Sequence, residues 1–333
     1  MASDPDLLSF HRRKLRHTAC AALALVLPGG GAFGQAYPGK PLRIVVAVAA
    51  GGPTDHLARL IGQKLSEAWR QPVTVDNRPG GGQLIGTAYA AKAPGDGYTL
   101  LMTTNVFPVN TFLYANLPYD PQRDFVPVSL VATASLLLVV NASLPVTTLA
   151  ELIEYARRNP GKLNFGSSGA SSSLRFAGEL LKTSASIDMV HVPFNGAAPL
   201  MSALMGNVVQ LAIVDSKAAN GPLESGRVRL LAVTSEKRSP NFPDVPTMSE
   251  AGLPGYSASS WFGLLAPSGT PPAVVAAIQA EVARILKLPE IQRELINHDE
   301  AGVGSTPAEF SNYIKAEALK WGKIIKDNNI TAQ

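Results

Sequence analysis

Two glycine- and hydroxyl-rich segments are the strongest candidates for a binding site. The first, 49–55, reads Ala-Ala-Gly-Gly-Pro-Thr-Asp and joins an apolar run to an amphipathic one. The second, 166–173, carries five serines and two glycines in the same setting. Ligands of α/β proteins bind where strands end and helices begin, because glycine admits close backbone approach and a helix N-terminus presents free N–H groups with partial positive charge. Each segment therefore predicts a site for an anion such as a carboxylate.

A purely structural interpretation stays open for both segments. Thr54 and Asp55 could simply cap the following helix while the glycines make the turn, and 166–173 could be a polar loop. The occurrence of two such segments in two halves of one chain favours binding. Facing each other across a cleft, they could hold the two ends of a small diacid.

Asp215 is a third candidate, because it ends the apolar run 211–214. A carboxylate at the carboxyl end of a strand could accept a hydrogen bond from a ligand amine or hydroxyl. The alternative is that Asp215 caps the next helix.

Signals for catalysis are weak. Beyond residue 34 the histidines are His56, His191 and His298, and none stands at metal-ligand spacing from another. The G-x-S-x-G, H-E-x-x-H, G-x-G-x-x-G and P-loop patterns are absent. His56 follows Asp55 directly and could act with it as a base. Adjacent side chains on a helix point apart, which argues against such a pair. We expect no catalytic residue, no metal and no cofactor.

Composition excludes several classes of protein. The chain has 333 residues, 46% of them hydrophobic and 16% charged, which is incompatible with a mainly disordered chain. Its formal net charge is +4. No basic run occurs after residue 34, so a nucleic-acid partner is not expected.

The N-terminal segment has the layout of a secretory signal peptide. Basic residues at 11–16 precede the apolar stretch 18–27, which is shorter than the roughly 20 residues that span a bilayer. Small residues at Ala32 and Gly34 predict a signal peptide over 1–34, cleaved after Gly34, with Ala36 as the second choice. The mature protein would then be periplasmic in a bacterium and would lack cysteine, since Cys20 is the only one. Sec and twin-arginine export both stay open.

The remaining chain alternates apolar, β-branched runs with amphipathic ones, which predicts an α/β fold with parallel sheets. Thr54 is the expected N-cap of the first helix. Strands are predicted at 42–48, 73–75, 98–102, 130–140, 163–165, 189–192, 209–214, 229–233 and 261–266. Helices are predicted at 54–69, 84–92, 148–159, 172–182, 199–205, 271–286, 290–297 and 307–326.

An ordered set of short motifs extends over 37–330. They are Tyr-Pro-Gly-Lys-Pro-Leu-Arg at 37–43, Gly-Gly-Pro-Thr-Asp at 51–55, Asp-Asn-Arg-Pro-Gly at 76–80, Pro-Gly-Asp-Gly-Tyr-Thr-Leu at 94–100, Leu-Pro-Tyr-Asp-Pro at 117–121, the loop 166–172, Val-His-Val-Pro-Phe at 190–194, Leu-Ala-Val-Thr at 231–234, Pro-Asp-Val-Pro-Thr at 243–247 and Trp-Phe-Gly-Leu-Leu-Ala-Pro at 261–267. In this order they resemble the Bug receptors, which are the periplasmic solute-binding proteins of tripartite tricarboxylate transporters.

The resemblance implies a two-lobed, type II-like periplasmic binding protein. Each lobe would be a mostly parallel sheet flanked by helices, with lobe 1 at 37–138 plus 259–333 and lobe 2 at 139–258. The cleft between the lobes would capture a small organic acid or amino acid, close like a Venus flytrap, and deliver the ligand to the membrane subunits of the transporter. A monomer is expected. The alternatives are a ligand sensor that partners a membrane signalling protein and an enzyme acting on a small organic acid.

The family's binding positions transfer to three segments here. The implied ligand-binding residues are Val48, Ala50, Gly51, Gly52, Thr54 and Asp55 in the first loop, Ser168, Gly169, Ala170, Ser171 and Ser172 in the second, and Asp215 with the segment of Thr103, Thr104 and Asn105 at the distal wall.

The chain departs from the usual family pattern at Val48 (usually Phe), Ala50 (usually Pro), Ser171 (commonly Gly), Arg175 (commonly His) and Asn195 (commonly Lys). Val48 should leave more room beside the ligand. Arg175, if it reaches the cleft, could pair with a second carboxylate. A dicarboxylate, an amino acid, an aromatic acid and a tricarboxylate all suit the two loops.

Overall fold

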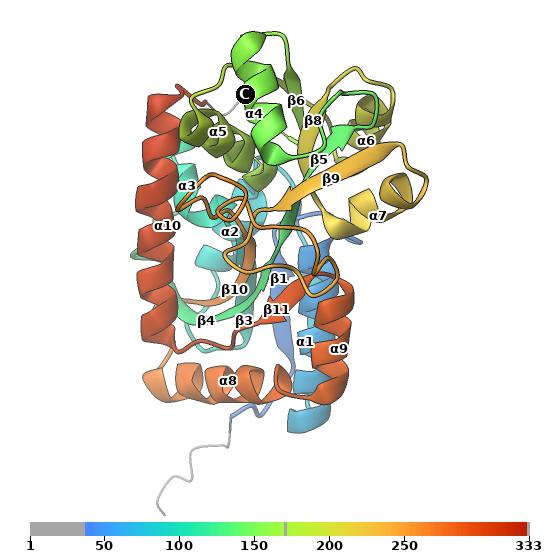
Figure 1. Ribbon diagram of the computed structural model, residues 1–333. Helices are drawn as coiled ribbons and strands as arrows, with labels where there is room; N and C mark the ends of the chain where they lie inside the picture. The colour runs from blue at the N-terminus through green and yellow to red at the C-terminus, as the bar shows by residue number, and fades with distance from the viewer. Residues whose placement is uncertain (1–36, 170–171, 332–333) are drawn as a thin grey trace, which may run out of the picture. The chain divides into compact units, whose positions relative to one another are not determined.

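The computed structural model describes residues 37–169 and 172–331 (Figure 1). The predicted signal peptide, Cys20, Ala170 and Ser171 lie outside the described residues. No helix within the described ranges combines the length and apolarity that a membrane crossing requires.

Within the described residues the first sheet has six strands in the order β11-β4-β10-β3-β1-β2. They are β1 (Leu42–Val46), β2 (Val73–Asn77), β3 (Thr99–Thr104), β4 (Phe125–Ala134), β10 (Ser260–Pro267) and β11 (Glu300–Gly302). Strand β1 is parallel to β2 and β3, whereas β10 is antiparallel to β3 and β4, and β11 is antiparallel to β4. Branched side chains suit the buried centre of this sheet, where Ile44, Val45 and Val46 are fully buried.

The described part of the chain forms a second sheet of five strands in the order β7-β6-β8-β5-β9. They are β5 (Leu136–Asn141), β6 (Asn164–Ser167), β7 (Val190–Pro193), β8 (Leu211–Asp215) and β9 (Val228–Val233). Strand β6 is parallel to β7 and β8, and β5 is antiparallel to β8 and β9. Both sheets are therefore mixed, and the expectation of mostly parallel sheets was wrong. The chain passes between the sheets twice, from β4 to β5 and from β9 to β10. Each antiparallel pair contains at least one of these four strands.

Helices flank both sheets (Figure 1). Those connected with the first sheet are α1 (Pro53–Trp69), α2 (Leu84–Ala91), α3 (Val106–Leu113), α8 (Pro272–Ile285), α9 (Pro289–Asn297) and α10 (Pro307–Asp327). Those of the second are α4 (Leu149–Arg158), α5 (Ser173–Ala185), α6 (Ala197–Met205) and α7 (Ser216–Glu224). Periodicity did not predict α3, α7 or β11, which are short.

Helix α1 begins one residue earlier than predicted. Its N-cap is Gly52, in an extended conformation, and Pro53 is the first helical residue. Proline suits this position because its φ is already helical and its missing N–H would have had no helical partner. Thr54 therefore lies inside the first turn and is not the N-cap.

The predicted strand 130–140 is two strands in two sheets. Strand β4 ends at Ala134, β5 begins at Leu136, and the N–H of Ser135 between them donates to the carbonyl of Asp299 (3.1 Å). Both strands are buried, so the apolar run is nearly continuous and hides the change of sheet. The return passage, 234–259, lies beside the first, because the N–H of Thr234 donates to the carbonyl of Leu136 (2.9 Å).

Helix α10 packs against parts of both sheets. Phe310, near its start, is fully buried and makes an edge contact with Trp261 of β10. Near its end, Trp321 and Ile324 join the core cluster that contains Phe165 of the second sheet. The long helix along one side of Figure 1 therefore connects the layers that form the two walls of the site described next.

Candidate ligand-binding cleft

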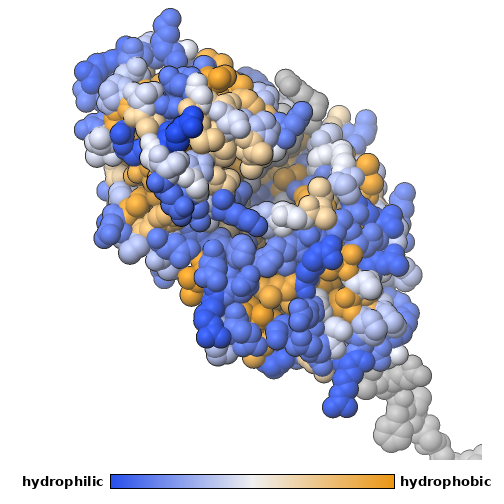
Figure 2. All heavy atoms as spheres, turned by 90° about the vertical axis from the view of Figure 1, so that its right-hand side faces the viewer, coloured by the Kyte–Doolittle hydropathy of each residue, from blue (hydrophilic) through white to orange (hydrophobic). Residues whose placement is uncertain are grey.

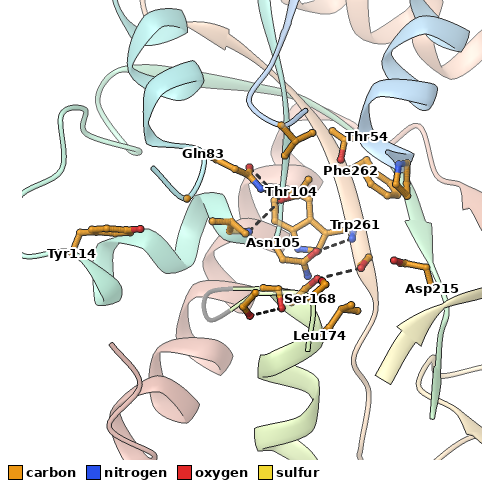
Figure 3. Close-up of a pocket in the computed structure, with 18 residues that line it drawn as sticks. Thr54, Gln83, Thr104, Asn105, Tyr114, Ser168, Leu174, Asp215, Trp261 and Phe262 are labelled. Atoms are coloured by element: carbon orange, nitrogen blue, oxygen red, sulfur yellow. Dashed lines mark hydrogen bonds between the residues drawn. The ribbon is translucent and has the colours of Figure 1, made fainter. Parts of the chain in front are cut away.

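A cavity of about 470 Å³ lies where strands of both sheets end (Figure 3). The first sheet and its helices contribute Val48, Pro53, Thr54, Gly82, Gln83, Thr104, Asn105, Val106, Tyr114, Ser260, Trp261 and Phe262. The second contributes Ser168, Gly169, Ser172, Ser173, Leu174 and Asp215. The described lining contains no lysine, arginine or histidine.

Five helices begin at this cavity. The lining residues include the first helical residue of α1 (Pro53) and the N-caps of α2 (Gln83), α3 (Asn105), α5 (Ser172) and α7 (Asp215). Each helix start carries a partial positive charge of roughly half a unit, and its first N–H groups have no partner within the helix. In α2 the N–H groups of Leu84 and Ile85 already donate to the carbonyls of Gly81 and Gly80, so the charge is that helix's main contribution. The cavity therefore favours an anion without any cationic side chain in its described lining.

The first loop is held from behind by a chain of hydrogen bonds. Asp55 is buried and accepts hydrogen bonds from the N–H of Gly51 (2.9 Å) and from Nε of Arg59 (3.1 Å). Burial raises the pKa of Asp55, but the bonds from Arg59, Gly51 and Asn77 outweigh it and lower the pKa overall. Arg59 also donates to Oδ1 of Asn77, whose amide donates to the carbonyl of Val48. Asp55 thus supports the loop from outside the cavity.

One carbonyl group organises the second loop. The hydroxyls of Ser167 and Ser172 both donate to the carbonyl of Gly169, each at 2.9 Å. Ser172 also accepts from the N–H of Arg175 (3.3 Å) and so caps α5. These bonds fix the loop on both sides of Gly169, and Ser168, Gly169 and Ser172 line the cavity.

His191 lies beneath this loop, with Nε2 2.7 Å from the hydroxyl oxygen of Ser167. Burial, and secondarily the nearby Arg175 and Lys182, lower the pKa of His191 to about 4. The ring is therefore neutral near pH 7. Since the Ser167 hydroxyl already donates to Gly169, the ring nitrogen of His191 is the donor to Ser167.

Arg175 and Asn195 lie outside the described cavity lining. The guanidinium Nε of Arg175 is 3.7 Å from Oε1 of Glu179 on its own helix, and burial lowers the pKa of Arg175. Asn195 is exposed.

The floor of the cavity rests on a buried polar network that sequence analysis missed. Oδ1 of Asn105 accepts from the N–H of Trp261 (2.9 Å), and its amide donates to the carbonyl of Ser259 (2.9 Å). Beneath them Oε2 of Glu317 accepts from the indoles of Trp261 (3.1 Å) and Trp321 (2.7 Å). Glu317 is 212 residues from Asn105 and lies on a helix, so no local pattern pointed to it.

Comparison with known proteins places the chain in a family. The model of the tripartite tricarboxylate transporter family receptor matches residues 57–330. The chain belongs to this receptor family. It is 38% identical to a Rhodopseudomonas palustris protein solved with adipate, with a TM-score of 0.79 over 89% of this chain and 99% of the other. It is 30% identical to MatC of the same organism, solved with malate (TM-score 0.74, 87% and 100%), and 31% identical to the periplasmic binding protein BugD (TM-score 0.76, 89% and 100%).

The family fold confirms the two-domain α/β architecture and the resemblance to Bug receptors. Members of the family are solute-binding receptors and not enzymes. Of the residues expected at the site, the structure brings together Val48, Thr54, Asn105, Ser168, Gly169, Ser172 and Asp215. Gly51 and Gly52 line a smaller adjoining cavity that also contains Pro53 and Asp215. Ala50, Asp55 and Thr103 line neither cavity, and Thr103 is fully buried.

Further receptor residues line the cavity but were not among the expected ones. Gln83 is one of them, and its Nε2 donates at 3.0 Å to the hydroxyl of Thr104, a cavity residue from the segment 103–105 that was expected at the distal wall (Figure 3). Tyr114 and Phe262 also line the cavity, as does Ser173 from the predicted segment 166–173. Trp261 and Phe262 belong to a motif noted in the sequence, whereas nothing local marks Tyr114.

Asp215 is the only carboxylate in the described cavity lining. It is the N-cap residue of α7, but its side chain makes no capping hydrogen bond. Figure 3 shows it at the edge of the cavity, on the side of Phe262. Burial raises the pKa of Asp215. The geometry leaves this carboxyl group available to a ligand.

Proposed function

We propose that this receptor captures a small carboxylate in the cavity of about 470 Å³ and delivers it to the membrane subunits of a tripartite tricarboxylate transporter. The convergence of five helix starts on a cavity whose described lining has no cationic side chain carries the proposal. A carboxylate that leaves water needs replacement hydrogen-bond donors, and free N–H groups and serine hydroxyls supply them. Adipate and malate in two relatives are ligands of this class.

The proposed pose places one ligand carboxylate between the two loops. Thr54 on α1 and Ser168 and Ser173 beside the start of α5 supply hydroxyls from opposite walls, while the Ser172 hydroxyl, which already donates to Gly169, holds the second loop. Asp215 then accepts a hydrogen bond from a hydroxyl, an ammonium group or a protonated carboxyl of the ligand. Ala50, Gly51, Gly52, Ala170 and Ser171 remain part of the proposed loops, and Thr103 and Asp55 support them.

Capture requires the walls to close on the ligand. We assign the proposed lobes to 37–138 plus 259–333 and to 139–258, with the hinge at Ser135 and the return segment 234–259. A hinge of this kind concentrates the backbone change in a few residues at element ends. The proposed protein is a periplasmic monomer, exported by the segment 1–34.

The first test identifies the molecule that the purified protein carries. Mass spectrometry of the denatured protein should release a small carboxylic acid, and a thermal-shift series of monocarboxylic, dicarboxylic, hydroxy and amino acids should stabilise the same class. Release of a nucleotide or a cationic ligand would contradict the proposal. Deletion of the gene should abolish uptake of that acid. Normal uptake would instead favour a sensing role.

A variant of Ser168 tests the loop directly. Its hydroxyl lines the cavity, and hydrogen bonds to charged groups contribute about 1.5–3 kcal/mol, so Ser168→Ala should weaken binding by roughly tenfold or more. Ser202→Ala on α6 is the matched control, because that hydroxyl is exposed and bonds only to the carbonyl of Ala198 among its described partners. Equal affinity of both variants, measured by calorimetry with the identified acid, would refute the assigned pose.

A further inference from the structure

Three potential metal ligands from opposite ends of the sequence meet beside the smaller cavity. His56 lies in the first turns of α1, Glu294 lies on α9, and His298 directly follows α9. Nε2 of His56 is 3.3 Å from Oε1 of Glu294, and Nδ1 of His298 is 3.8 Å from the same oxygen. The two imidazole rings are stacked, with centroids 4.4 Å apart. One donor atom of each residue lies within 4.8 Å of the other two.

Each histidine keeps its Nε2 as a nitrogen that can bind a metal. In His56 this is the nitrogen that faces Glu294, whereas in His298 the contact with Glu294 is made by the other nitrogen, Nδ1. Nδ1 of His298 is 2.9 Å from the backbone carbonyl of Glu294, which places the ring proton on Nδ1 and leaves a lone pair on Nε2. Histidines that bind metals commonly use their second nitrogen in this way. Nε2 of His56 is a buried atom with no hydrogen-bond partner among the described residues. An unsatisfied buried nitrogen beside a carboxylate requires a reason, and a bound cation supplies one.

The adjoining cavity has space for one further ligand. His56 and His298 line it together with Gly51, Gly52, Asp215, Lys217 and Glu300, and its volume is about 20 Å³. That volume accommodates a single water molecule. Glu294 does not line this cavity but lies beside both histidines, so two imidazoles, its carboxylate and one water would make the four-coordinate set of an open zinc site. The nearby charges are the acids Asp215 and Glu300 and the cation Lys217.

We propose that His56, Glu294 and His298 form a site for a borderline divalent cation, with Zn²⁺ as the probe, and Ni²⁺ and Co²⁺ as ions of the same class. Two nitrogen ligands disfavour Mg²⁺ and Ca²⁺, which take oxygen ligands. The cation ties the start of α1 to the end of α9. Because the loop 49–55 ends in this part of α1, the site braces the first wall of the ligand cavity without entering it. Figure 2 shows the face that carries α1, α7 and α9 as mostly hydrophilic.

The decisive experiment measures zinc binding to the purified protein, prepared without a histidine tag and stripped with a chelator. We expect one Zn²⁺ per chain by calorimetry and by metal analysis after dialysis. The variants His56→Asn, Glu294→Gln and His298→Asn should each bind zinc at least about tenfold more weakly. The matched control is Glu290→Gln on the same helix, because Glu290 pairs with Lys64 and lies outside the cluster. It should bind zinc like the parent.

A second readout needs no variant and does not depend on the carboxylate ligand. In NMR spectra of the parent protein, zinc should shift the ring signals of His56 and His298 and leave those of His191 unchanged. Absence of stoichiometric binding, binding unchanged in all three variants, or a response of His191 alone would overturn the proposal. Thermal unfolding in chelator should be the same for parent and variants, which separates loss of the site from loss of the fold.

Discussion

Removal of the Glu317 carboxylate should destabilise the protein by an amount that its hydrogen bonds define. One oxygen, Oε2, accepts from the indoles of Trp261 (3.1 Å) and Trp321 (2.7 Å), and these two tryptophans are at most 2% exposed. Asn105 contributes a longer bond of 3.4 Å to the same oxygen. Glu317→Ala therefore leaves two buried indole N–H groups without an acceptor.

Each orphaned buried donor costs about 1–3 kcal/mol, which gives about 2–6 kcal/mol for the pair. Water can enter from the cavity that Glu317 and Lys320 line on the far side, and it offsets part of this cost. We expect a loss of about 3 kcal/mol in the free energy of unfolding. Glu317→Gln keeps one oxygen for the indoles but exchanges a charged acceptor for a neutral one, and should lose about 1 kcal/mol.

The assay is urea unfolding followed by circular dichroism and tryptophan fluorescence. Trp261 and Trp321 report on the site itself, because both indoles contact the altered group. Glu154→Ala on α4 is the control: its partner Arg158 is exposed, and exposed ion pairs contribute at most about 1 kcal/mol. A loss below about 1 kcal/mol in Glu317→Ala, or equal losses in the Ala and Gln variants, would refute the reasoning.

Three further predictions concern the loops and the core. His191 has a pKa of about 4 in the folded chain against 6.5 as its ordinary value, so the folded state binds fewer protons between these pH values, and stability should fall as pH drops from about 6.5 to about 4. Because the ring is partly exposed, we expect on the order of 1–2 kcal/mol, measured by denaturant titration at several pH values. Burial also lowers the pKa of His56, so part of the slope should remain in His191→Gln, and an undiminished slope would contradict the assignment. Gly263→Ala places a Cβ 2.0 Å from Cζ of the buried Phe310, and this overpacking should lower the free energy of unfolding by about 1–3 kcal/mol. An unchanged free energy of unfolding in denaturant would show that the ring can move aside. Gly51→Ala should lower the free energy of unfolding by about 1–2 kcal/mol, because φ of Gly51 is +90°. Gly52 has a φ of −86°, so Gly52→Ala should be neutral or slightly stabilising in the same assay. Equal effects of the two variants would exclude backbone strain as the cause.

Local signals account for most of the predicted elements. Helix α4 and its cap Thr148 occupy nearly the predicted range, because the apolar positions and the cap are adjacent in sequence. The strand at 130–140 could not be divided from the sequence, since β4 and β5 are both buried and only Ser135 separates them. The antiparallel pairing of β10 likewise leaves no local trace, because apolar content reports burial and not direction.

The amino acids at 49–55 and 166–173 were sufficient to predict two strand–loop–helix elements suited to an anion. In each segment the glycines, the serines and the first residues of a helical repeat follow one another directly, so their effect on the backbone is local. Only the tertiary structure decided which side chains complete the cavity and which support it from behind. Asn105 meets Glu317, and His56 meets His298, because the sheet order brings distant segments together. Such contacts depend on strand pairing and helix packing across the whole chain, and no single stretch of sequence contains that information.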